Sequence, residues 1–193
     1  MVREREFDPN EALDRAMTLF WENGFSDTSM EDLVASTGVS RYGIYGTFGN
    51  KREFFIAALQ RYAEQVSREY HPGLFAADAA PADIEEFMTG AIARSVETDG
   101  HRGCMICNTA VELAPDDPAI AAAVRDLFDQ LAAAFATAIA NGQAVGDVNP
   151  DVDPKATGEL LVGVLQGALV MARTGAGKTR LTAYIDSALG ILG

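Results

Sequence analysis

Residues 30–48 constrain the fold of this chain more than any other segment, because they read as two short helices joined by a sharp turn. Gly38 stands where the first helix must end in the left-handed conformation, which glycine adopts without strain. Ser40 is placed to cap the second helix by accepting a hydrogen bond from a free backbone N–H group. Apolar residues recur at helical spacing at Ile44, Tyr45 and Phe48, and we expect them to face inward. The pattern predicts a helix-turn-helix, although a helical hairpin within an ordinary bundle would give a similar one.

The second helix of a helix-turn-helix lays its N-terminal end in the major groove of DNA. Arginine, serine and tyrosine side chains at that end can reach base edges and phosphates. Lysine at a helix N-terminus opposes the helix dipole, so an external phosphate explains Lys51 better than local stability does. We expect Arg41 and Tyr42 to face the groove, and Tyr45 and Lys51 to contact phosphates. The full set of predicted DNA contacts is Thr28, Ser29, Ser40, Arg41, Tyr42, Gly43, Tyr45 and Lys51.

From about residue 10 to residue 55, the chain resembles the DNA-binding head of the tetracycline-repressor (TetR) family of transcriptional regulators. The residues that carry the resemblance are Phe20, Gly24, Phe25, Thr28, Gly38, Val39, Ser40, Tyr45, Phe48 and Lys51. The chain departs from the family pattern at Val34, where a small alanine is usual. Gly43 and Gly46 also weaken the second helix, each by about 1 kcal/mol relative to alanine. The head carries more acidic than basic residues, which predicts weak non-specific affinity for DNA.

Composition limits the function classes that fit. A net charge of −13 argues against a general nucleic-acid coat and against a protein that binds anionic membranes, but allows contact with DNA through one small face. The N-terminus is charged and lacks the apolar run of a signal peptide, and no segment has some 18 uninterrupted apolar residues. The two cysteines are three residues apart, unlike a secreted disulfide framework. We therefore expect a cytoplasmic protein that neither crosses nor binds a membrane.

Beyond the head, the sequence predicts helix after helix and no convincing strand. The expected fold is all-α, with a three-helix DNA-binding head at residues 1–50 and a helical ligand-binding and dimerisation domain at residues 51–193. Its predicted helices cover residues 51–70, 82–98, 104–113, 118–140, 154–173 and 179–192. Asn141 and Gly142 are expected to end the fourth of these helices, at residues 118–140.

The last two predicted helices are apolar over more than half of their circumference, so each must bury more than one face. Gly163 and Gly167, four residues apart, would allow another helix to approach closely. The TetR resemblance implies that these helices pair with their copies in a four-helix homodimer interface, and Leu165 and Leu189 are expected to lie in it. The alternative is a pair of helices that is central in a monomer.

Residues 172–179, ARTGAGKT, satisfy only the loosest phosphate-loop pattern. A working phosphate loop follows a buried strand, and a long helix precedes this one, so we expect a helix–helix turn. His101, Cys104 and Cys107 supply three potential metal ligands, whereas a structural zinc site usually needs four. We therefore expect no metal and no cofactor.

Cys104 follows a glycine at a predicted helix start, where the helix dipole would lower the pKa of a thiol. It could sense an electrophile or an oxidant, and the alternative is that both cysteines are small buried hydrophobic residues.

The interior of the C-terminal domain could hold a small hydrophobic effector, since methionine and aromatic side chains suit adaptable pockets. The candidate ligand-binding residues are Phe87, Met88, Ile92, Cys104, Met105, Asn108, Glu112, Phe128, Gln166 and Met171. The sequence thus predicts a regulator, most simply a repressor, that binds double-stranded operator DNA as a homodimer and is released by this effector. A thiol-based sensor using Cys104 and a DNA-bound regulator without a ligand are the alternatives. An enzyme is the competing class, but we find no nucleophile–base pair, so we expect no enzymatic activity.

Overall fold

The computed structural model describes residues 7–97 and 102–193, and all regular structure within these ranges is helical, which confirms the predicted all-α fold. The helices are α1 (Pro9–Asn23), α2 (Met30–Thr37), α3 (Arg41–Phe48), α4 (Lys51–Glu64), α5 (Pro81–Glu97), α6 (Met105–Glu112), α7 (Pro118–Val145), α8 (Pro154–Arg173) and α9 (Lys178–Leu189). A π-helical turn, η1 (Gln65–Tyr70), continues α4, and a 3-10 turn, η2 (Gly190–Leu192), follows α9.

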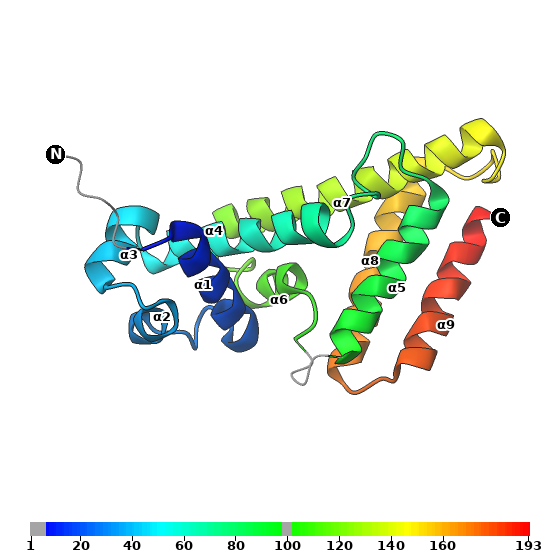
Figure 1. Ribbon diagram of the computed structural model, residues 1–193. Coiled ribbons are helices and arrows are strands. Elements are labelled where there is room, and N and C mark those ends of the chain that lie inside the picture. Colours follow the sequence, from blue (N-terminus) through cyan, green and yellow to red (C-terminus); the bar gives the residue numbers. More distant parts are fainter. Residues whose placement is uncertain (1–6, 98–101) are drawn as a thin grey trace.

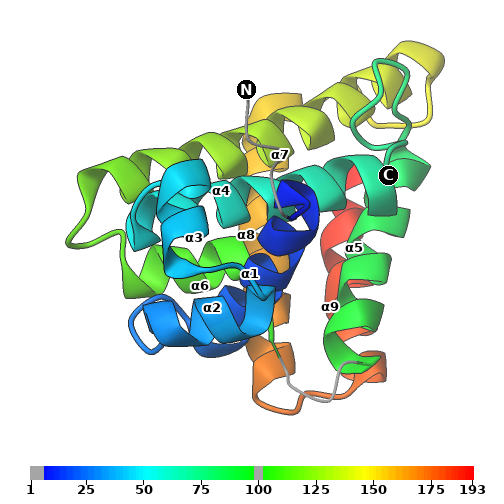
Figure 2. The same ribbon diagram turned by 60° about the vertical axis from the view of Figure 1, so that its left-hand side comes forward.

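The molecule has a small head, α1–α3, at one end and a bundle of α5, α8 and α9 at the other (Figure 1). Helix α4 and the long helix α7 run from the head toward the bundle and lie side by side, as a second view also shows (Figure 2). The short helix α6 packs against both α4 and α7. Helices α4, α6 and α7 therefore connect the bundle with the head.

Side-chain caps explain where several helices begin. Ser29 and Asp32 form a reciprocal capping box at the start of α2, and Asn50 and Glu53 form another at the start of α4. Asp117 caps α7 by accepting hydrogen bonds from two backbone N–H groups, with a proline in the first turn. These local signals lie close together in the sequence, which is why most helix boundaries could be predicted from it.

Two hydrophobic cores hold the structure together. The head core consists of buried residues of α1–α4 together with Met105, Ile120 and Val124 from α6 and α7. The body core joins buried residues of α5, α7, α8 and α9. Since Phe54, Phe55 and other residues of α4 belong to the head core, a division between residues 50 and 51 cuts through this core.

The long helix α7 ends five residues later than the sequence suggested. It continues through Asn141 and Gly142 to Val145 and stops at Gly146, which has a positive φ of 87°. Gly142 lies inside the helix because of packing, since a Cβ there would lie 2.5 Å from Pro81 and 2.7 Å from Val148. The predicted helix end at residues 141–142 was therefore wrong, because the glycine serves a close contact and not a turn.

Helix α8 packs most closely against α7. A Cβ at Gly158 would lie 2.5 Å from the backbone oxygen of Ala132, so glycine is what lets the two backbones approach. By length and composition alone, α8 is the one helix among the described residues that could cross a membrane, and 44% of its most apolar window is buried inside the molecule. The central helix of a helical bundle can be as long and as apolar as a membrane-spanning helix.

Candidate functional site

The helix-turn-helix consists of α2, a turn at Gly38 and α3. Gly38 has a φ of 71°, Val39 is buried in the corner, and the Ser40 side chain accepts a hydrogen bond from the backbone N–H of Gly43 at 3.1 Å. These features agree with the local structure predicted from the sequence. They fix the angle at which α3 leaves the head and project its N-terminal end away from the core.

The N-terminal end of α3 presents polar and aromatic side chains to solvent. Tyr42 is 86% exposed, and Arg41 is exposed and forms an ion pair with Glu31 of α2. Ile44 is completely buried, as expected, whereas Tyr45 is 49% exposed. The expectation that Tyr45 faces inward was wrong, because α3 directs Ile44 into the head core and Tyr45 toward solvent. An exposed Tyr45 remains available to a phosphate.

Thr28 and Ser29 precede α2 and differ in exposure. The Thr28 side chain is completely buried, and its hydroxyl donates a hydrogen bond to the Gly24 carbonyl oxygen at 2.6 Å. Its predicted contact with DNA is therefore wrong, because the hydroxyl holds the turn between α1 and α2. Ser29 is exposed, and its side chain already accepts a hydrogen bond from the Asp32 N–H in the capping box.

Lys51 lies at the first position of α4, with its ammonium nitrogen 4.2 Å from the centre of the Phe25 ring. This cation–π contact is a local interaction that stabilises the lysine, and it was not expected from the sequence. The same contact holds the side chain beside the head, where it keeps a positive charge at the surface. Its contact with a phosphate remains a prediction.

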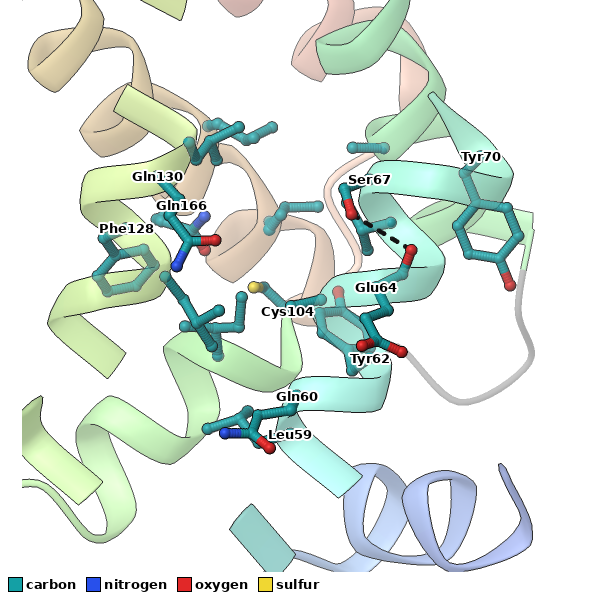
Figure 3. Close-up of a pocket in the computed structure, with 18 of the residues that line it drawn as sticks. Leu59, Gln60, Tyr62, Glu64, Ser67, Tyr70, Cys104, Phe128, Gln130 and Gln166 are labelled. Carbon is teal, nitrogen blue, oxygen red and sulfur yellow. Dashed lines mark hydrogen bonds between the residues drawn. The ribbon is translucent and has the colours of Figure 1, made fainter. Parts of the chain in front are cut away.

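A cavity of about 1100 Å³ lies between α4, η1, α5, α7 and α8, and the segment that leads into α6 closes one side (Figure 3). Aromatic and aliphatic side chains form much of its wall, among them Tyr62, Phe87, Phe128, Leu165 and Leu169. The cavity is within the size range of binding sites for drug-sized molecules, or slightly above it. It is the structural counterpart of the pocket expected from the sequence.

Four of the ten candidate ligand residues line this cavity, namely Phe87, Cys104, Phe128 and Gln166. The other six do not line it. Met88 and Ile92 are completely buried in the body core, and Met105 belongs to the head core. Met171 packs against the body core from the surface of α8.

Asn108 and Glu112, the other two residues that do not line the cavity, make polar contacts elsewhere. The Asn108 side chain accepts a hydrogen bond from Arg173 at 2.6 Å and donates one to the Arg102 carbonyl oxygen. The carboxylate of Glu112 accepts hydrogen bonds from the backbone N–H groups of Phe25 at 3.1 Å and Ser26 at 2.7 Å. Glu112 therefore joins the end of α6 to the head.

Helix α4 and η1 also contribute to the cavity wall, which was not predicted from the sequence. The missed residues include Leu59, Tyr62, Val66, Ser67 and Tyr70. The apolar face of this helix was visible in the sequence, but helical periodicity does not distinguish a face that packs on a core from one that borders a cavity.

Two polar atoms on the cavity wall lack hydrogen-bond partners among the described residues. They are Ser95 Oγ on α5 and Gln166 Oε1 on α8, and both atoms are shielded from solvent. A third such atom, His71 Nε2, is also buried, but His71 does not line the cavity. A buried polar group without a partner is unfavourable, so these two side chains would gain a hydrogen bond by turning toward a ligand or water in the cavity.

Cys104 is the N-cap residue of α6 and is buried. Burial raises the pKa of its thiol to about 11, although the neighbouring N–H groups and the hydroxyl of Tyr62 act in the opposite direction. The prediction that the helix dipole lowers this pKa was wrong, because the loss of water outweighs the dipole. Burial also raises the pKa of Cys107, and Arg173 opposes that rise.

Several contacts tie the head to the body. Arg52, the second residue of α4, forms a two-pronged ion pair with Asp117, the N-cap of α7, at 2.5 and 2.6 Å. Trp21 Nε1 donates a hydrogen bond to the Gly103 carbonyl oxygen at 3.2 Å, and its ring packs edge-on against Tyr62. The cavity wall, α6 and the head are thus in direct contact.

The outer face of α8 and α9 exposes large apolar side chains. Leu160 and Val170 of α8, Tyr184 of α9 and Ile191 of the following turn η2 are each between 42% and 49% exposed. Nothing lies within 4 Å of a Cβ built at Gly163, and only the Tyr184 hydroxyl lies near one at Gly167. Leu165, by contrast, is 2% exposed and belongs to the body core, so its predicted place in a subunit interface was wrong. Leu189 is half-buried against the same core.

The segment that matched a loose phosphate-loop pattern is the turn between α8 and α9, as predicted. Among the described residues, no group of three or more His, Cys, Asp or Glu side chains could hold a metal ion. His101, the histidine considered beside the two cysteines, lies outside the described residues.

Comparisons with known protein families agree with this arrangement. Residues 12–58 match the family described as bacterial regulatory proteins, tetR family, and residues 80–189 match the tetracyclin repressor-like C-terminal domain. The two matches cover the helix-turn-helix and most of the body, including α5–α9.

Individual relatives match nearly the whole chain. The HTH-type transcriptional repressor ComR of Escherichia coli is 31% identical over 180 residues, covering 93% of this chain and 86% of ComR. The uncharacterised HTH-type regulator YezE of Bacillus subtilis is 28% identical over the full length of both chains. A cysteine mutant of the TetR family regulator CifR, solved with a 26-base-pair operator DNA, is 27% identical and has a TM-score of 0.84. That match covers 99% of this chain and 100% of the CifR chain.

Proposed function

The chain belongs to the TetR family of DNA-binding transcriptional regulators, and we propose that it represses transcription by binding a two-fold symmetric operator as a homodimer that a small molecule releases. The observation that carries this proposal is the exposed N-terminal end of α3, set at a fixed angle by a helix-turn-helix. Membership in a family of regulators supports regulation in place of catalysis, and it supports a location in the cytoplasm beside the DNA.

The proposed DNA contacts divide between bases and phosphates. Arg41 and Tyr42 project from the first turn of α3 and are suited to base edges in the major groove. Ser29, Ser40, Gly43, Tyr45 and Lys51 lie around the helix-turn-helix and are suited to the DNA backbone. Arg41 is paired with Glu31 in the free protein, so binding DNA requires this exposed ion pair to open. An exposed pair contributes only about 0–1 kcal/mol, which a phosphate or guanine contact offsets.

A homodimer is supported by the apolar outer face of α8 and α9. Side chains that are half exposed in one chain can be buried by the same face of a second chain, since a two-fold axis brings a patch against itself. The two exposed glycines of α8 would let the paired helices approach closely. A dimer places two α3 helices on one face of DNA, about 34–36 Å apart or a multiple of that distance.

Release by a ligand is supported by the position of α6. Its first residues border the cavity, and its last residue, Glu112, binds the backbone of the turn before α2. Helix α4 likewise lines the cavity at Tyr62 and begins at Lys51 beside the DNA-binding surface. A ligand that displaces either helix would change the separation of the two heads and lower affinity for the operator.

Selection from a random duplex library, followed by binding measurements on the enriched sequence, tests the proposal. We expect an inverted repeat whose half-site centres lie about 10 base pairs, or a multiple of that, apart. Glu112→Ala should leave effector binding intact but reduce the effect of the effector on operator affinity. Val111→Ala, at the exposed neighbour of Glu112, is the control. It should change neither effector binding nor the effect of the effector on operator affinity. Enrichment of a single asymmetric half-site would contradict the dimer part of the proposal.

A further inference from the structure

We propose that the cavity is built for a neutral, largely apolar molecule that carries a hydroxyl group, such as an alkylphenol or an alcohol of similar size. This inference rests on the proposed function, because it names the class of effector that the regulator would bind. It is carried by the cavity of about 1100 Å³ and by the two buried polar atoms on its wall that have no partner.

The apolar part of the ligand follows from the residues that surround it. Tyr62 and Phe87 face the cavity from α4 and α5, and Phe128, Leu165 and Leu169 face it from α7 and α8. These aromatic rings and branched aliphatic side chains gain free energy by covering an apolar surface, and the Tyr62 hydroxyl interacts with the Cys104 side chain and the Met105 backbone. Burial raises the pKa of Tyr62 well above its usual value, so its ring faces the ligand as a neutral phenol.

The hydroxyl group follows from Ser95 and Gln166. An amide oxygen such as Gln166 Oε1 can only accept, so the ligand must supply a donor. The Ser95 hydroxyl can donate or accept, so it can pair with a ligand oxygen. A hydroxyl group is both donor and acceptor and satisfies either atom. A ketone or an ether has no hydrogen to give to Gln166, and a hydrocarbon would leave both atoms unpaired.

The charged side chains around the cavity make a carboxylate the main competing ligand. Arg94 lines the wall with its guanidinium carbon 5.0 Å from the centre of the Tyr70 ring, and Arg68 lies nearby on η1. Glu64 and Asp126 line the same cavity, so charges of both signs surround it. A carboxylate carries no donor for Gln166 Oε1, which favours the neutral ligand.

Trp21 provides the measurement, because it is the only tryptophan in the chain and lines the cavity. The protein is titrated with 4-tert-butylphenol, 4-tert-butyltoluene and 4-tert-butylbenzoate while the Trp21 fluorescence is followed. Excitation is at a wavelength longer than those that phenols absorb. The three probes have the same apolar body and differ in one substituent: a hydroxyl, a methyl or a carboxylate group. We expect the phenol to bind about tenfold more tightly than the toluene, as one net hydrogen bond would give, and more tightly than the benzoate.

The substitution Gln166→Leu should remove most of the preference for the phenol and leave the affinity for the toluene almost unchanged. Gln130, on the α7 side of the cavity in Figure 3, allows a matched control, since Gln130→Leu should keep the preference. Thermal unfolding of the ligand-free Gln166→Leu variant separates recognition from a structural role. Because this substitution removes a buried oxygen without a hydrogen-bond partner, the melting temperature of the variant should equal or exceed that of the wild type. Ser95→Ala is a second, smaller change that should also reduce the preference.

Equal affinity for the phenol and the toluene would overturn the inference, and so would tighter binding of the benzoate. Binding by neither neutral probe would overturn it as well. The regulator proposal is tested apart from these outcomes, by operator selection and by the oligomeric state. If these probes refute the inferred ligand class, the DNA-binding and dimer parts of the proposed function are therefore unaffected.

Discussion

At the scale of single residues, the DNA-binding surface depends on a few exposed side chains whose neighbours decide their availability. Lys51 is held over the Phe25 ring, and Arg41 is held by Glu31. Neither partner blocks DNA, because one leaves the ammonium group at the surface and the other is a weak exposed ion pair. The two cations should nevertheless affect binding differently, since one faces the phosphates and the other the groove.

We predict that Lys51→Ala weakens binding to all duplexes and lowers the slope of log K against log salt concentration by about 1, because one phosphate contact is lost. Arg41→Ala should instead reduce the difference in binding free energy between operator variants, by about 1–3 kcal/mol at the base pair that Arg41 contacts. Glu31→Gln frees Arg41 and should raise the affinity slightly. Fluorescence anisotropy at several salt concentrations measures all three. Unchanged base preference in Arg41→Ala would mean that α3 does not read the groove through this residue.

The two cysteines should be unreactive at neutral pH. The thiolate is the reactive form, and burial that raises the pKa of Cys104 to about 11 leaves very little of it. We expect iodoacetamide to label both thiols of the native protein slowly, and both rapidly after unfolding in urea. Mass spectrometry of timed samples reports the two sites separately. Faster native labelling of Cys104 than of Cys107 would restore the sensor hypothesis.

At the scale of elements, the junction between α4 and α7 depends on an ion pair. The Arg52 guanidinium holds the pKa of Asp117 well below its usual range, and the hydrogen bonds that Asp117 accepts as a helix cap act in the same direction. The unfolded chain therefore binds a proton at this carboxyl at a higher pH than the folded chain does. The stability that the group contributes is fully present above its usual pKa of about 3.9 and is lost as the pH falls through the lower folded value.

We predict that Asp117→Asn flattens the decrease in stability between about pH 4 and pH 2, because the titrating group is gone. Urea unfolding at a series of pH values measures this slope. Asparagine can still cap α7, so the variant should stay folded at pH 7. Asp116→Asn is the adjacent control and should keep the wild-type slope. An unchanged slope in Asp117→Asn would show that other carboxyls account for the acid sensitivity.

At the scale of the whole molecule, dimerisation should control operator binding. One helix-turn-helix on a net acidic head has little affinity, and two joined heads roughly add their binding free energies. We predict that Leu160→Glu and Tyr184→Glu, both on the exposed face of α8 and α9, yield folded monomers that no longer bind a two-fold operator with wild-type affinity. Analytical ultracentrifugation and circular dichroism measure mass and folding.

Leu165 supplies the contrast for that experiment. It is 2% exposed in the body core, so Leu165→Glu should unfold the chain instead of separating the subunits. A folded monomer of Leu160→Glu that still binds the two-fold operator as tightly as the wild type would refute the link between dimerisation and function.

The helices, their order and the helix-turn-helix could all be predicted from local sequence signals. These depend on signals within one turn of each other, such as Ser29 with Asp32 at α2 or Gly38 at its end, and such signals can be read directly along the chain. The resemblance to TetR regulators was visible for the same reason, since its residues gather in one short segment.

The tertiary structure alone decided which apolar residues border the cavity, which fill a core and which face solvent. Met88 and Tyr62 both belong to helical apolar stripes, yet Met88 is completely buried in the body core and Tyr62 lies on the cavity wall. Periodicity gives the face of a helix but not what that face meets. The exposure of Tyr45, the burial of Thr28 and the high pKa of Cys104 likewise depend on residues distant in sequence that exclude or admit water.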